Sequence, residues 1–169
     1  MRKLLISLAF VTACQGSNGD TSASKGAKEG SKPDLIGAYL EIQTTLARDS
    51  IDALPELSAQ VITAAEGLSG PGIDALVAGA GRTAAGDIAT ARAGFKKMSY
   101  GLLAHINATP ALKDGREVIF CPMAFNNDGA HWIQKQGDII NPYHGKMMLH
   151  CGDRVSWADA AKDERATLK

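Results

Sequence analysis

The sequence predicts a mainly α-helical protein, in which an antiparallel up-down helical bundle is followed by a loop-rich segment that carries cysteine and methionine. Two observations predict this fold. Apolar residues recur every three or four positions through residues 34–107, and short links that contain glycine or proline separate the periodic stretches. Beyond residue 107 the periodicity ends, and turn-forming residues alternate with short apolar runs.

The bundle is expected to contain three periodic stretches. The first spans residues 34–50, and the second spans residues 56–68 and ends at Ser69-Gly70-Pro71-Gly72. The third spans residues 73–106, and its glycines predict a kink or turn near residues 79–82 that divides a short helix from a long one.

The C-terminal part is expected to contain little regular structure. We predict that residues 108–155 form a loop region packed on the bundle as part of the same domain, and that residues 156–169 form a polar tail. Within this part, residues 117–125 begin as a short extended run, residues 130–136 suit one helical turn, and residues 153–169 suit a short helix or a frayed tail.

Composition argues against some classes of function. The 18 basic residues balance 18 acidic ones, and aromatic residues make up only 5% of the chain. Nucleic acid is therefore not an expected partner, because no excess positive charge is left to neutralise phosphates. No apolar run approaches the ~20 residues that a transmembrane helix requires.

The N-terminal residues nevertheless predict export and a membrane anchor. Arg2 and Lys3 precede an apolar run, and Val11-Thr12-Ala13-Cys14 resembles the lipobox of bacterial lipoproteins. That resemblance implies that residues 1–13 are a signal peptide and that Cys14 is acylated. Residues 14–33 are expected to form a flexible tether, because the segment after Cys14 contains no large apolar residue. Gln15 fits sorting to the outer membrane, facing the periplasm. The alternative is an ordinary secretory peptide with an incidental cysteine.

Sulfur and imidazole side chains gather in the C-terminal third. Their spacing leaves three possibilities open: a soft-metal site for Cu(I) or Ag(I), with zinc less expected; a disulfide between Cys121 and Cys151; or a thiol nucleophile with a histidine base. The chain contains no phosphate-binding loop, HExxH motif or nucleophile elbow, so we expect no enzyme. The candidate residues are Cys121, Met123, His144, Met147, Met148, His150 and Cys151.

A longer motif runs through the same region. It reads Cys121-Pro122-Met123-Ala124, Asn126-Asn127, Gly129-Ala130, Trp132, Asn141-Pro142-Tyr143, Gly145, Met148-Leu149 and Cys151-Gly152. It resembles a bacterial domain of unknown function that occurs in exported proteins and at the C-terminus of copper and silver efflux adaptor subunits.

The resemblance implies heavy-metal binding by Cys121, Met123, Met148 and Cys151, with Met147, His144 and His150 as accessory candidates only. The chain lacks the hairpin and barrel segments of an efflux adaptor, so we expect a stand-alone binder that buffers the ion or hands it to an efflux system. The competing expectation is a non-catalytic structural or adaptor lipoprotein, in which a disulfide between Cys121 and Cys151 staples the loop and the bundle docks onto an envelope protein partner.

Overall fold

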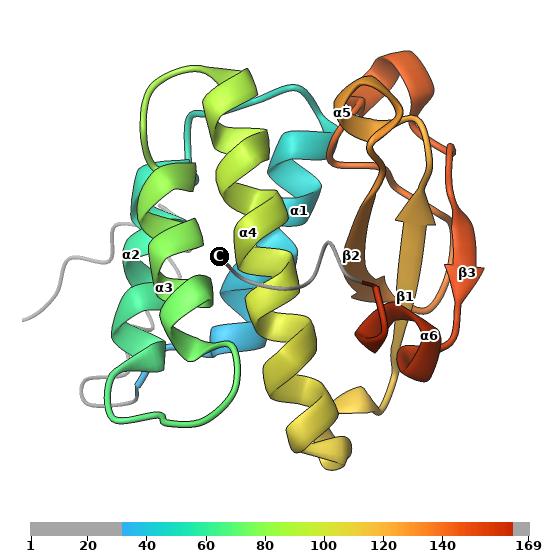
Figure 1. The fold of residues 1–169 in the computed structure, drawn as a ribbon. Helices are drawn as coiled ribbons and strands as arrows, with labels where there is room; N and C mark the ends of the chain where they lie inside the picture. The colour runs from blue at the N-terminus through green and yellow to red at the C-terminus, as the bar shows by residue number, and fades with distance from the viewer. Residues whose placement is uncertain (1–31, 164–169) are drawn as a thin grey trace, which may run out of the picture. The chain divides into compact units, whose positions relative to one another are not determined.

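The computed structural model describes residues 32–163, which belong to one compact unit. The predicted signal peptide, the lipidation site Cys14, most of the predicted tether and the last six residues of the predicted tail lie outside the described residues. Within them, a layer of helices packs against a small antiparallel sheet (Figure 1). The prediction of a mainly α-helical fold is confirmed.

The first four helices begin and end close to where the periodicity predicts. Asp34 and Asp87 accept hydrogen bonds from main-chain N–H groups of the first turns that follow them, and Pro55 occupies the first turn of the second helix. Each start is therefore set by local sequence. The helices are α1 (Leu35–Ala47), α2 (Leu54–Ala65), α3 (Ile73–Thr83) and α4 (Ile88–Ala108).

The third periodic stretch is divided into a short and a long helix as predicted, but the predicted position of the break, near residues 79–82, is wrong. These residues lie inside α3, and the chain turns after Thr83 instead. Gly79 lies so close to Met98 of α4 that a β-carbon would overlap the Met98 main chain. Gly101 lies equally close to the main chain of Leu76 in α3. The glycines at these positions therefore allow α3 and α4 to approach closely, and they do not mark a kink.

The C-terminal part contains a sheet that the sequence did not predict. The strands are β1 (Arg116–Cys121), β2 (Ala130–Lys135) and β3 (Asp153–Val155), in the order β2-β1-β3 with both pairs antiparallel. The helical turn predicted over residues 130–136 is therefore wrong. Ala130–Gln134 is buried at every position, so the strand lacks the alternation of buried and exposed residues by which a strand is recognised.

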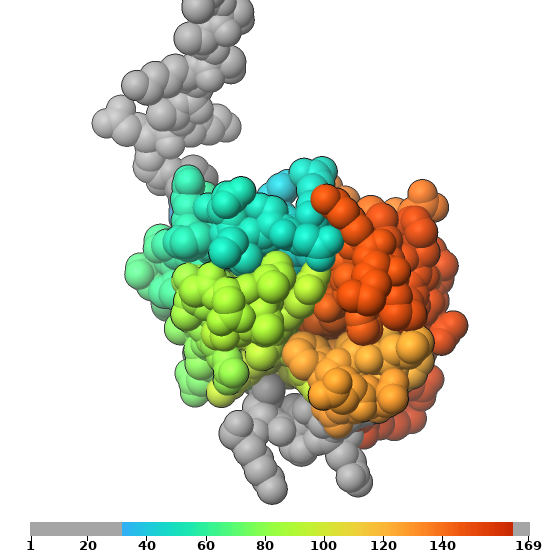
Figure 2. All heavy atoms as spheres, turned by 90° about the horizontal axis from the view of Figure 1, so that it is seen from above, coloured from blue at the N-terminus to red at the C-terminus, as the bar shows by residue number. Residues whose placement is uncertain are grey.

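Short elements complete the C-terminal part. β3 ends directly before the predicted tail of residues 156–169. The described part of that tail begins with a short helix, for which Ser156 accepts a hydrogen bond from the Asp159 N–H. Residues of this part lie beside the helices in the view of Figure 2. No helix among residues 32–163 is both long and apolar enough to cross a membrane. The short elements are η1 (Pro110–Lys113), α5 (Ala124–Asn127), η2 (Gly145–Met148) and α6 (Trp157–Ala161).

Tyr39 of α1 connects the helices to the sheet. Its side chain is fully buried, and its ring stacks on Phe95 of α4 at 5.0 Å between centroids. Its hydroxyl accepts a hydrogen bond from the Ile133 N–H in β2 at 3.1 Å and lies 2.7 Å from Ser99 Oγ in α4. Burial raises the pKa of Tyr39 well above its usual value, so the hydroxyl stays protonated.

We expect Tyr39→Phe to lower the free energy of unfolding by about 1–3 kcal/mol, because the Ile133 N–H would remain buried without its partner. Urea denaturation followed by circular dichroism measures this change. Glu41→Gln, on an exposed position of the same helix, is the control. Equal stability of the Tyr39→Phe protein and the parent would contradict the assigned role of the hydroxyl.

Candidate functional site

Two cysteine thiols meet at one end of the sheet. Cys121 is the last residue of β1, and Cys151 lies two residues before β3; their Sγ atoms are 3.3 Å apart. Both are free cysteines; Cys121 is buried and Cys151 is half-buried. Because Phe120 pairs with Asp153, the β1–β3 register brings two cysteines 30 positions apart in sequence to adjacent places.

Gly152 makes this approach possible. A β-carbon at Gly152 would overlap the Ile119 and Trp132 side chains, and its φ of 147° belongs to the region that favours glycine. The Cys151 N–H donates to the Met148 carbonyl at 3.0 Å, which closes the turn that leads into the pair.

The Asn141 side chain holds the Cys151 loop through a hydrogen bond to its main chain. This buried side chain donates from Nδ2 to the Cys151 carbonyl at 2.7 Å. Its Oδ1 accepts hydrogen bonds from the main-chain N–H groups of Tyr143 and His144 at 2.8 and 3.1 Å. Asn141-Pro142-Tyr143 therefore forms a turn that is linked to the cysteine pair. The sequence analysis did not predict this link, because a sequence shows no partner for an asparagine amide.

The surroundings of Cys151 favour the neutral thiol. Burial, followed by the hydrogen bond and the charge of Cys121, and then Asp153, raises its pKa from 9.0 to about 11. A reactive cysteine instead has a lowered pKa, because a neighbouring cation or a helix N-terminus stabilises the thiolate. The raised pKa therefore argues against a thiol nucleophile at this position.

The three histidines of the C-terminal part have contacts other than the cysteines. His131 Nδ1 lies 3.4 Å from the Tyr100 hydroxyl and 3.3 Å from Asp163 Oδ2. Nδ1 of His150 lies 2.7 Å from the Ile139 carbonyl oxygen, and the side chain is exposed. His144 lines a pocket together with Met123, and neither cysteine contributes to that pocket.

The predicted soft donors separate into distinct places. Cys121 and Cys151 come together, and Met148 lies nearby through its main-chain contact with Cys151. Met123 is 46% exposed and faces the pocket of His144, and Met147 is 82% exposed on η2. Among residues 32–163, no three His, Cys, Asp or Glu side chains converge as a metal site.

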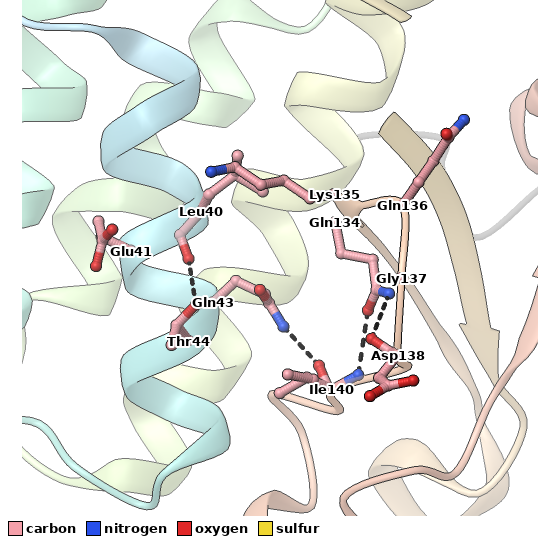
Figure 3. A pocket seen from close by; sticks show the side chains of 10 residues that line it. All are labelled: Leu40, Glu41, Gln43, Thr44, Gln134, Lys135, Gln136, Gly137, Asp138 and Ile140. Carbon is pink, nitrogen blue, oxygen red and sulfur yellow. Dashed lines mark hydrogen bonds between the residues drawn. The ribbon is translucent and has the colours of Figure 1, made fainter. Parts of the chain in front are cut away.

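A second pocket lies between α1 and the end of β2, with a volume of about 360 Å³ (Figure 3). Gln43 Nε2 donates to the Ile140 carbonyl at 2.5 Å, and Gln134 Oε1 accepts from the Ile140 N–H at 3.2 Å. Gln134 Nε2 donates to the Asp138 carbonyl at 3.0 Å. These amides therefore secure the 136–140 loop to α1 and β2, which is a structural role.

Comparison with protein-family models, with curated proteins and with solved structures found no match to this chain. The resemblance of the cysteine-methionine motif to an efflux-associated domain stays a prediction.

The raised pKa predicts slow alkylation of Cys151. At pH 8 a thiol with a pKa of about 11 has about 100-fold less thiolate than one with a pKa of 9.0. We expect iodoacetamide to modify Cys151 in the native Cys14→Ser protein correspondingly more slowly than in urea, with the rate rising toward pH 11. Peptide mapping by mass spectrometry measures the rate.

The raised pKa of Cys151 also makes the free energy of unfolding depend on pH. The unfolded thiol ionises near its usual pKa while the folded thiol does not, so the folded state loses stability as pH rises from about 9 to about 11. Rapid labelling of native Cys151 at pH 7 to 8 would contradict the assigned environment.

Proposed function

We propose that this protein is an exported, lipid-anchored, non-catalytic binder of one soft metal ion, Cu(I) or Ag(I), held between Cys121 and Cys151. The observation that carries the proposal is the distance of 3.3 Å between the two Sγ atoms. Soft sulfur ligands favour monovalent copper and silver over hard cations.

The spacing of the sulfurs suits a shared ion after a small outward movement. Two sulfurs bound at about 2.3 Å lie about 4.0 Å apart when the ion is trigonal and about 4.6 Å apart when it is linear. The two thiols, 3.3 Å apart, must therefore separate by about 0.7 to 1.3 Å to hold such an ion. Cys151 lies in a loop and is half-buried, so it is the partner with room to move. Met148, whose carbonyl bonds to the Cys151 N–H, is the nearest candidate for an additional sulfur ligand.

The number of ligands favours a soft monovalent ion over zinc. Structural zinc sites have four protein ligands drawn from Cys, His and carboxylates. Among the described residues, two thiols meet without a third Cys, His, Asp or Glu. We therefore assign the ion two thiolate ligands, or three ligands if a methionine also binds.

The raised pKa of Cys151 makes metal binding depend on pH. An ion that binds sulfur displaces the thiol proton, so its affinity rises with pH until the thiol is already ionised. Within the same proposal, residues 34–107 are an antiparallel up-down bundle that supports the pair, and lipid on Cys14 holds the domain at the outer membrane facing the periplasm. From there the ion is stored or passed to an efflux system.

One observation favours a second function. The two Sγ atoms are about 1.3 Å farther apart than in a disulfide. In an oxidising compartment the same pair is able to form a bond that staples the loop, and the protein then acts as a structural or adaptor lipoprotein for an envelope partner.

A single preparation tests both functions. The full chain with Cys14→Ser, which contains only these two thiols, is isolated without reductant, and its free thiols are counted. It is then titrated anaerobically with Cu(I) against a competing chelator. We expect two free thiols and one tightly bound ion, and we expect Cys121→Ser or Cys151→Ser to weaken binding by at least 100-fold.

Met147→Leu is the matched control, because it removes a sulfur from an exposed side chain away from the pair. Circular dichroism must show the same helical content in every variant. Tight binding that survives both cysteine substitutions would refute the proposed site. Paired thiols that bind no ion, with a large fall in melting temperature on reduction, would establish the disulfide function instead.

A further inference from the structure

A pocket of about 610 Å³ lies between the start of α4, the short α5 segment and the Tyr143-His144 turn. The face drawn in Figure 2 shows the start of α4 bordering the C-terminal segments. The lining includes small and apolar side chains of α4 together with two residues that carry soft or borderline donors, Met123 and His144. Neither Cys121 nor Cys151 belongs to it.

His144 has an unused ligand atom. Its Nε2 is buried and has no hydrogen-bond partner, although its main-chain N–H is held by Asn141 at 3.1 Å. A buried ring nitrogen without a partner is costly, and binding a metal ion is one way to satisfy it. Met123, 46% exposed on the same pocket, supplies a thioether sulfur that solvent reaches.

The charges around the pocket select the kind of ion. Its lining contains no carboxylate, so a hard divalent cation finds no anionic oxygen ligand there. Arg92 is the charged residue of the lining, and its guanidinium is bound to Asp49 at 2.6 Å and to the carbonyls of Leu46 and Pro142. Neutral sulfur and imidazole ligands suit a soft monovalent ion.

The backbone beside the pocket is strained. Phe125, Asn126 and Asn127 have φ values of 55°, 58° and 69°, in the left-handed region that residues with a β-carbon seldom adopt. The turn is closed by the Gly129 N–H donating to the Ala124 carbonyl at 2.8 Å. It places all three strained residues in the lining and follows directly after Met123. Strain of this kind gathers at ligand sites.

We propose that Met123 and His144 form an outer site that receives Cu(I) or Ag(I) and passes it to Cys121 and Cys151. This inference rests on the proposed function. Cys121 is fully buried and Cys151 is half-buried, whereas Met123, two residues beyond Cys121, is 46% exposed and is the sulfur more open to solvent. In the transfer the ion leaves the thioether and the imidazole, each thiol releases its proton to water as its sulfur binds, and no oxidation state changes.

The test uses Ag(I) with the full chain carrying Cys14→Ser. We expect the double variant Met123→Leu, His144→Gln to bind Ag(I) at least ten times more slowly in stopped-flow measurements, with an equilibrium affinity within threefold of the parent. Met147→Leu is the matched control, and its rate should equal that of the parent because this exposed methionine lies outside the pocket.

A second measurement isolates the outer site. In the Cys121→Ser, Cys151→Ser background, Ag(I) should shift the NMR signals of the His144 ring and the Met123 methyl group, and adding Met123→Leu and His144→Gln should abolish weak binding. An unchanged association rate, or Ag(I) shifts absent from these two residues, would overturn the outer site while tight binding by the parent still supports the cysteine site.

Other outcomes separate the two proposals. If Met123→Leu, His144→Gln lowers the equilibrium affinity 100-fold, these residues belong to the tight site and the separate outer site is wrong. If the parent binds no ion tightly, the proposed function fails; weak binding in the cysteine-free background that depends on Met123 and His144 would still support the outer site.

Discussion

Burial of the Tyr143 ring is the interaction on which the C-terminal half depends. The ring contacts three other aromatic rings, those of Phe95 in α4, Phe125 in α5 and Trp132 in β2, with centroids 5.3 to 5.9 Å apart. Its hydroxyl donates to the His131 carbonyl at 2.5 Å. Aromatic packing with a satisfied hydroxyl therefore fixes one turn against the helices, the left-handed segment and the sheet together.

Asn141 extends this anchorage to both candidate sites. One amide group bonds to the Cys151 carbonyl and to the main-chain N–H groups of Tyr143 and His144, so the cysteine loop and the His144 turn share one support. Gly145 continues the turn with a φ of 58°. A β-carbon at this position would overlap side-chain atoms of Asp49 and Arg92.

Desolvation gives the cysteine pair its chemical character. The burial that brings the two Sγ atoms within 3.3 Å also disfavours charge on Cys151, so that this thiol is protonated at neutral pH. The neutral Cys151 thiol reacts slowly with electrophiles, yet it remains a ligand for an ion that displaces a proton from sulfur. Such a pair suits storage of an ion better than nucleophilic chemistry.

The sequence by itself determined the helices, because apolar spacing and caps such as Asp34 and Asp87 act within a few residues. It also identified the two cysteines as a potential pair. Only the tertiary structure decided the sheet, because Ala130–Gln134 is buried throughout and shows no alternation, and because the paired residues of β1 and β3, from Phe120–Asp153 to Val118–Val155, are 33 to 37 positions apart in sequence. The separation of Met123 from Cys121 was likewise decided there. β1 ends at Cys121 and Met123 has helical backbone angles, so the strand alternation that would place both side chains on one face stops between them.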